Sequence, residues 1–282
     1  MAAMMSQEDH VVVITGGAMG IGKEVSKRLA IQQKAKVCIL DVNEKEGLNT
    51  VNEITNEGGV AHYFRCDVSD HESLQSVKKE IQAHPQLGNV HIVICNAAVL
   101  RIGECLDMTE KDYKINSDVN ILGHIYTVRT FLPEMIAAQR GHIVSVGSIC
   151  SYYGEHYGTA YCTAKFACRG FIEALHMEMI AKGLYNKIVF TSIYPYFVRT
   201  NMIDQLEEPH STFYEVVPLD KCAREVIDAI LKEKLNHFIP GSIGFLCLYL
   251  KCLTTKSLLP YGRKLFNFSY HPKAKAAKIM EV

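Results

Sequence analysis

Short apolar runs rich in β-branched residues alternate with helical stretches along most of the chain, and this alternation limits the possible folds more than any other feature. The runs occupy residues 10–15, 36–41, 60–66, 91–95, 142–147, 187–194 and 236–240. Helical stretches occupy residues 23–32, 44–56, 73–83, 112–139, 159–182 and 221–234. Strands separated by helices of this length form βαβ units, because parallel neighbours need a long crossover. The pattern predicts an α/β fold, a doubly wound, mostly parallel sheet of seven strands with helices on both faces.

Composition places the chain among folded proteins. Of its 282 residues, 48% are hydrophobic and 21% are charged, as in a globular protein. We expect a single domain over residues 1–240 and a distinct extension over residues 241–282. The formal net charge is zero, which argues against a nucleic-acid-binding surface. The cysteines form no C-x-x-C pair and the histidines no ligand cluster, so we predict no metal site and expect reduced thiols in an intracellular protein.

A glycine-rich turn follows the first predicted strand and leads into the first helix. It contains Gly16, Gly20 and Gly22. Glycines let the backbone approach a pyrophosphate, and the free N–H groups at a helix start attract the anion. Asp41 ends the second strand, where a carboxylate can bind the adenosine ribose hydroxyls and would repel a 2′-phosphate. The pattern predicts a Rossmann-type site for NAD, in preference to NADP.

A second pattern joins Tyr161 and Lys165, which lie four residues apart on a predicted helix and so share one face. A tyrosine is a poor base at neutral pH, but a neighbouring ammonium group favours the phenolate and lowers its pKa. Ser148 follows the fifth strand and could place a hydroxyl beside the phenol. These three residues are candidates for acid–base chemistry.

Together these motifs resemble those of the short-chain dehydrogenase/reductase family. The chain carries, in order, T-G-G-x-x-G-I-G over residues 15–22, then Asn120, Ser148, Tyr161 and Lys165. The resemblance covers about residues 10–240. It implies reversible hydride transfer between an alcohol carbon and a nicotinamide ring, and a homodimer formed through the helices around residues 112–139 and 159–182.

The resemblance also implies roles for individual residues. Tyr161 would be the general base or acid, Ser148 would bind the substrate oxygen, and Asn120 would anchor a water that links Lys165 to solvent. Asp67 and Val68 would lie beside the adenine, and Asn96 and Ala97 under the central ribose. The residues expected to contact NAD are Gly16, Gly20, Ile21, Gly22, Asp41, Asp67, Val68, Asn96, Ala97, Lys165, Pro195, Val198 and Thr200.

Two positions depart from the family pattern. The family's N-N-A-G after the fourth strand is C-N-A-A over residues 95–98, which lacks one amide side chain and one glycine. The family's Pro-Gly after the sixth strand is Pro-Tyr here, so the ring of Tyr196 is expected near the nicotinamide. With Tyr153 and Phe197 it is predicted to contact the substrate, although each of these aromatics could be a packing residue instead.

An aromatic substrate mouth favours an NAD-dependent dehydrogenase of a steroid, a retinoid or another long-chain alcohol. Two alternatives stay open at this point. One is a carbonyl reductase of small polar ketones, which the aromatic residues disfavour. The other is a cofactor-binding protein that has lost catalysis and acts through interactions, which the intact set of candidate catalytic residues argues against.

The extension is basic and contains an apolar run. Residues 241–282 hold seven basic residues and one acidic residue, and the apolar run 243–250 is too short to span a bilayer. Such a segment fits peripheral contact with an endoplasmic reticulum membrane or a lipid droplet, or a lid over the substrate mouth. Residues 238–241 and 256–260 are similar to the 17β-hydroxysteroid and retinol dehydrogenase branch, whose usual N-terminal anchor is not recognised here. We expect a cytoplasmic or peripherally membrane-associated protein.

Overall fold

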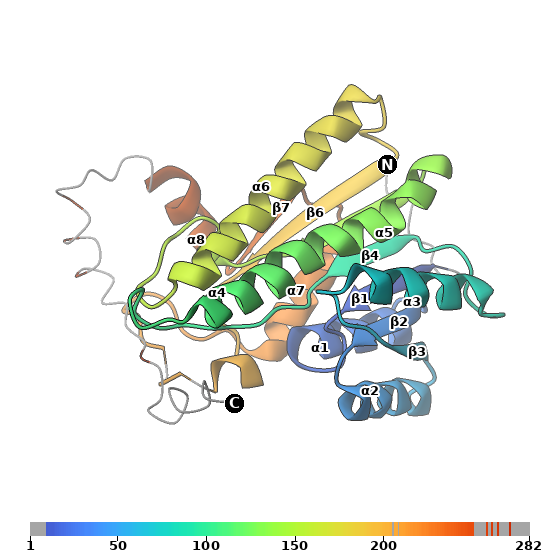
Figure 1. Cartoon of the computed structure of the whole chain (residues 1–282), viewed down its shortest axis with the longest axis horizontal. Coiled ribbons are helices and arrows are strands. Elements are labelled where there is room, and N and C mark those ends of the chain that lie inside the picture. Colours follow the sequence, from blue (N-terminus) through green and yellow to red (C-terminus); the bar gives the residue numbers. More distant parts are fainter. Residues whose placement is uncertain are drawn as a thin grey trace.

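A computed structural model of the protein shows a central sheet of seven parallel strands (Figure 1). The structure describes residues 10–204, 206–207 and 209–250, together with residues 258, 261, 264 and 271. The strand order is β3-β2-β1-β4-β5-β6-β7, and every neighbouring pair is parallel, which confirms the predicted fold. The strands are β1 (Val11–Thr15), β2 (Lys36–Asp41), β3 (Val60–Arg65), β4 (Ile92–Cys95), β5 (Gly141–Val146), β6 (Ile188–Pro195) and β7 (Asn236–Ile239).

Helices cover both faces of the sheet (Figure 1). They are α1 (Gly20–Ile31), α2 (Glu44–Asn56), α3 (His71–Ala83), α4 (Glu110–Asn116), α5 (Gly123–Ala137), α6 (Thr159–Ala181), α7 (Leu219–Leu231) and α8 (Ser242–Phe245). Successive side chains of a strand point to opposite faces. Val11 and Val13 of β1 accordingly pack in one core with α3, α5 and α6, whereas Val12 and Ile14 pack in the other with α1 and α7.

The helix expected over residues 112–139 is interrupted. It begins earlier than predicted, where Thr109 and Asp112 form a capping box at the start of α4. The segment Ser117–Leu122 is a π-helix, η1, and α5 follows it. The prediction of one continuous helix was wrong because apolar periodicity does not detect the extra residue of a π turn. Such turns are frequent at functional sites.

The first residues of the C-terminal extension pack on the main domain. The helix α8 and the π-helical segment Leu246–Leu250 follow β7, and they bury Ile243 and Cys247. Gly244 lies against the ring of Phe238. A Cβ at position 244 would lie 2.7 Å from that ring. The core therefore continues beyond residue 240. Most of residues 251–282, including most of the predicted basic segment, lies outside the described residues.

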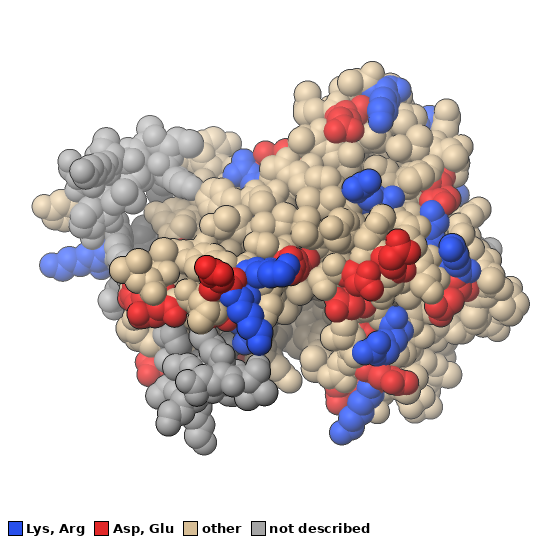
Figure 2. Space-filling model, viewed as in Figure 1, with Lys and Arg blue, Asp and Glu red and all other residues tan. Residues whose placement is uncertain are grey.

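The described surface carries mixed charges. On the face seen in Figure 2, basic and acidic side chains are interspersed over the described helices. Within the described ranges, no helix combines the length and the hydropathy that crossing a bilayer requires.

Candidate active site

The turn after β1 is packed so closely that side chains are excluded. Gly16 has a φ of +65°, and a Cβ at Gly22 would lie 2.1 Å from the Gly16 carbonyl oxygen. Asn96, directly after β4, donates its amide to the carbonyl oxygens of Thr15 at 3.0 Å and Gly16 at 2.9 Å. The Ala97 N–H donates to the Thr15 hydroxyl at 3.2 Å. Asn96 and Ala97 thus brace the turn, and their contact with a ribose stays a prediction.

The start of α1 is suited to an anion. Gly20 is its first residue, and the N-cap Met19 makes no side-chain hydrogen bond to the helix. A helix start without a side-chain cap can offer its N–H groups and positive dipole end to a phosphate. Ile21, in the same turn, lines the pocket described below. The glycine turn has no room for a side chain at position 22, and it leads directly into this helix start. Both features fit the pyrophosphate of a dinucleotide.

Asp41 ends β2 and is bonded to the glycine turn. One carboxylate oxygen accepts a hydrogen bond from the Ala18 N–H at 3.1 Å, and the other accepts one from the Asn43 N–H at 3.0 Å. The side chain is half-buried. These two bonds hold the carboxylate at the rim of the turn, where the sequence predicts contact with the adenosine ribose.

Asp67 and Val68, which follow β3, have different surroundings. The exposed Asp67 carboxylate accepts hydrogen bonds from the Ser69 N–H at 2.9 Å and hydroxyl at 2.6 Å. Val68 is buried and packs against Gly123 at the start of α5. The contact is so close that a Cβ at Gly123 would lie 2.7 Å from the Val68 side chain. Their contact with an adenine stays a prediction.

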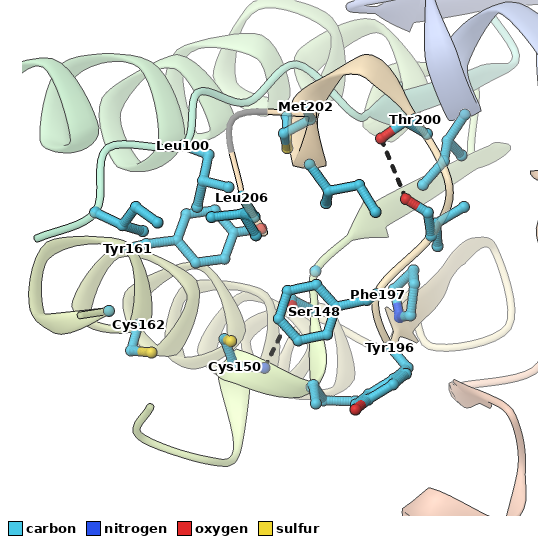
Figure 3. A pocket seen from close by; sticks show the side chains of 18 residues that line it. Leu100, Ser148, Cys150, Tyr161, Cys162, Tyr196, Phe197, Thr200, Met202 and Leu206 are labelled. Atoms are coloured by element: carbon cyan, nitrogen blue, oxygen red, sulfur yellow. Dashed lines mark hydrogen bonds between the residues drawn. The ribbon is translucent and has the colours of Figure 1, made fainter. Parts of the chain in front are cut away.

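Ser148 and Tyr161 meet in one pocket (Figure 3). Ser148 follows β5 and caps the short 3-10 helix Ile149–Ser151, where its hydroxyl accepts from the Cys150 N–H at 3.2 Å. Tyr161 lies in the first turn of α6, and its phenol is close enough to Ser148 for that side chain to act on its pKa. The structure thus brings two of the predicted catalytic hydroxyls together.

Lys165 is buried one turn after Tyr161 on α6. Its ammonium donates to the Val146 carbonyl oxygen at 3.2 Å and lies 5.6 Å from the centroid of the Tyr161 ring. Burial lowers the pKa of Lys165 and raises the pKa of Tyr161, although Ser148 acts against the rise. The depression of the Tyr161 pKa by Lys165 and the oxidised nicotinamide stays a prediction.

Asn120 is buried in η1 and ties it to the loop after β4. Its side-chain oxygen accepts from the Val99 N–H at 2.8 Å, and its amide donates to the Val99 carbonyl oxygen at 2.9 Å. Its own backbone carbonyl oxygen lies 2.8 Å from the Cys168 sulfur, which donates to it from α6. Asn120 therefore links α6 to the loop after β4. Its role in holding a water stays a prediction.

The remaining pocket wall is largely apolar (Figure 3). The last residue of β6 and the segment after it supply Pro195, Val198 and Thr200 of the predicted cofactor set and the predicted substrate residues Tyr196 and Phe197. Tyr153 is not among the described residues that line this pocket. Further lining residues that sequence reasoning missed are Leu100, Ile102, Met202, Ile203 and Leu206. They lie outside the predicted strands and helices, where no periodicity indicates which way a side chain points.

Comparison with known proteins identifies the family. A sequence model described as short chain dehydrogenase matches residues 10–211. The chain belongs to this family. It is therefore a nicotinamide-dependent oxidoreductase that acts on CH–OH groups, as the family and its named members are. The residues of the glycine turn described above fit such a cofactor.

Two relatives illustrate the branch, and they confirm the predicted resemblance to retinol and 17β-hydroxysteroid dehydrogenases. Epidermal retinol dehydrogenase 2 of Mus musculus is 31% identical over 253 residues, which cover 89% of this chain and 78% of the relative. The 17-beta-hydroxysteroid dehydrogenase 13 of Homo sapiens is 33% identical over 239 residues, covering 83% of this chain and 76% of the relative.

Solved structures share the fold. A short chain dehydrogenase/reductase from Burkholderia phymatum in complex with NAD has a TM-score of 0.78 at 21% identity, covering 89% of this chain and 96% of that one. An alcohol dehydrogenase from Thermococcus sibiricus complexed with 5-hydroxy-NADP has a TM-score of 0.68 at 21% identity, covering 81% and 94%. The fold thus accommodates either dinucleotide.

Proposed function

We propose that this enzyme uses NAD to interconvert a lipophilic alcohol, such as a steroid, a retinoid or a long-chain alcohol, and its carbonyl compound. One observation carries the proposal: the hydroxyls of Ser148 and Tyr161 lie in one pocket whose other walls are largely apolar. Such a pocket binds an apolar molecule and holds its polar end at a defined place. The relatives named as retinol and 17β-hydroxysteroid dehydrogenases support the same substrate class.

Each polar residue of the pocket has a role in this proposal. Tyr161 takes the proton of the substrate hydroxyl during oxidation and returns it during reduction. Ser148 donates a hydrogen bond to the substrate oxygen as negative charge develops there. Lys165 binds the nicotinamide ribose, and its charge stabilises the Tyr161 phenolate. Asn120 holds a water that connects Lys165 to solvent. NAD, when bound, supplies the hydride acceptor.

The experiment is an alcohol panel. The full-length protein is incubated with NAD and with retinol, oestradiol, a long-chain alcohol or small polar alcohols, and the absorbance of the reduced nicotinamide is followed. We expect faster turnover of the lipophilic members at equal concentration. Faster turnover of the small polar members would favour a reductase of small polar ketones instead. Measured NAD binding with no turnover of any alcohol would favour the non-catalytic interaction protein.

The choice of NAD rests on Asp41, whose charge at the rim of the glycine turn would repel a 2′-phosphate. We expect Asp41→Asn to reduce the preference for NADH over NADPH by about tenfold, or about 1.4 kcal/mol. The dissociation constants of both reduced cofactors, measured by nicotinamide fluorescence, give the ratio. Asp107→Asn is the matched control at an exposed carboxylate in the loop before α4, and we expect it to leave the ratio nearly unchanged. An unaltered ratio in Asp41→Asn would assign the selectivity to other residues.

We further propose that the enzyme forms a homodimer through α5 and α6. The exposed apolar side chains of Phe166, Met177 and Ile180 on α6 support this arrangement, since burying them against a second copy removes apolar surface from water. Light scattering of the purified protein measures the assembly. A monomer at micromolar concentration would contradict the proposal.

The extension is proposed to contact the substrate mouth and a membrane or lipid-droplet surface. His271 supports the first role, because its Nδ1 lies 3.4 Å from the Tyr157 hydroxyl and its backbone oxygen accepts from the Glu207 N–H at 2.8 Å. The exposed rings of Phe245 and Tyr249 support the second. Flotation with anionic liposomes compares the full chain with one ending at residue 250, which retains the buried part of the extension. Equal flotation would exclude residues 251–282 as the membrane contact.

A further inference from the structure

Two cysteines adjoin the catalytic hydroxyls in sequence and in space. Cys150 lies two residues after Ser148, and Cys162 directly follows Tyr161. Both line the pocket, and Figure 3 shows their side chains on the same side of it. The two thiols are close enough for each to shift the pKa of the other. Because Cys150 is only 9% exposed and Cys162 only 6%, a reagent would reach them through the pocket.

The surroundings of Cys162 favour its thiolate. Its sulfur accepts a hydrogen bond from the Glu155 backbone N–H at 3.4 Å, and it lies in the first turn of α6, near the positive end of the helix dipole. The proximity of the two thiols lowers the pKa of Cys162 and raises that of Cys150. By contrast, burial raises the pKa of the Cys38 thiol to about 12. The hydrogen bond from Glu155 and the position at the helix start therefore make Cys162 the better nucleophile of the two.

We propose that Cys150 and Cys162 form an oxidisable dithiol site in the pocket wall, which hydroperoxides convert into an intramolecular disulfide. The site goes beyond the alcohol chemistry proposed above and uses none of its hydroxyl groups. Its substrate class is a small peroxide that enters the apolar pocket.

The reaction balances with one hydroperoxide. The Cys162 thiolate attacks one peroxide oxygen, the O–O bond breaks, and a sulfenic acid forms while the departing oxygen leaves as water after taking a proton. The Cys150 sulfur then attacks the sulfenic sulfur, the S–S bond forms, and the hydroxyl leaves as a second water with the proton of Cys150. The two thiols are oxidised by two electrons, and hydrogen peroxide is reduced to two waters.

Oxidation of this pair will disturb the catalytic hydroxyls. A disulfide fixes its two sulfurs about 2.0 Å apart, so its formation would tie the 3-10 turn to the start of α6. The Cys150 N–H is bonded to the Ser148 hydroxyl, and Cys162 is the neighbour of Tyr161. We therefore expect dehydrogenase activity to fall at least fivefold on oxidation and to return with dithiothreitol.

Mass spectrometry tests the disulfide without reference to any alcohol substrate. The full-length protein is treated with hydrogen peroxide, free thiols are blocked with N-ethylmaleimide, and trypsin then cuts after Arg140 and Lys165. The peptide between these cuts contains Cys150 and Cys162 and no other cysteine. We expect it unalkylated and lighter by two hydrogen atoms than the reduced peptide. Cleavage after Glu155 should leave its two halves joined until dithiothreitol is added.

Two variants separate the roles of the thiols. Cys150→Ala should halt the reaction at the Cys162 sulfenic acid, which dimedone labels. Cys162→Ala should give no dimedone adduct at Cys150. The control is Cys105→Ser, which removes an exposed thiol, and its peroxide-treated peptide should match that of the unaltered chain. The activity of each variant after peroxide treatment is compared with the activity of the same variant before treatment. A loss of activity caused by the substitution itself is therefore not mistaken for oxidation.

Three results would overturn the proposal. The first is full alkylation of both pocket thiols after a peroxide dose that oxidises Cys105. The second is separate adducts on Cys150 and Cys162 with no joined peptide. The third is a dimedone adduct on Cys150 in place of Cys162. The peptide measurement on the unaltered chain decides the first two even where a variant fails to fold.

Discussion

Replacing Tyr161 by phenylalanine is expected to lower alcohol oxidation about a thousandfold while NADH still binds with nearly unchanged affinity. The substitution removes only the phenolic oxygen, which shares the pocket with Ser148. Steady-state rates measure turnover, and nicotinamide fluorescence measures binding. Since burial raises the pKa of Tyr161, we also expect the oxidation rate of the unaltered enzyme to increase with pH.

The control for this prediction is Tyr185→Phe, which removes the same oxygen from a side chain that is 63% exposed, beyond the end of α6. Its turnover should equal that of the unaltered enzyme. Near-normal turnover in Tyr161→Phe would contradict the assignment of this residue as the proton-transfer group. Loss of NADH binding together with turnover would indicate instead that the substitution deforms the cofactor site.

Gly22→Ala is expected to weaken NADH binding about a hundredfold and to destabilise the fold by roughly 1–3 kcal/mol. Its Cβ would lie 2.1 Å from the Gly16 carbonyl oxygen and 2.6 Å from the Asn96 amide nitrogen. The first neighbour is backbone, so the turn itself must move. Nicotinamide fluorescence and thermal unfolding measure the two effects.

Gly170→Ala is the matched control for this substitution. Position 170 lies within α6, and a Cβ there would meet nothing within 4 Å. Alanine favours a helix over glycine, so this variant should be more stable by about 0.5–1 kcal/mol and should bind NADH normally. Normal NADH affinity in Gly22→Ala would contradict the assignment of the turn as the cofactor cradle.

The main features of the fold could be predicted because the local signals agree with one another. Alternation of β-branched runs and helical segments indicated the parallel sheet, and the ends of the runs located the turn at Gly16 and the carboxylate of Asp41. Tyr161 and Ser148 could be paired because the motif of a known family spans the intervening residues. These features depend on residue type and spacing, which a sequence displays directly.

What could not be predicted depends on three-dimensional contacts. The π turn around Asn120 arises from its amide bonds to Val99, 21 positions away, and these leave no periodic signal. The raised pKa of Tyr161 follows from burial by residues distant in sequence. Leu100 and Leu206 line the pocket from irregular segments, and only the folded chain shows that they face it.

The Asp41 carboxylate is expected to select the cofactor. It also accepts hydrogen bonds from the Ala18 and Asn43 N–H groups. A cationic or small side chain at this position could not accept these two hydrogen bonds, and the glycine turn would lose them. A redesign toward NADP would therefore lose affinity for both dinucleotides unless a second substitution restored an acceptor for the Ala18 N–H. The expected cofactor preference and the order of the glycine turn therefore depend on the same side chain.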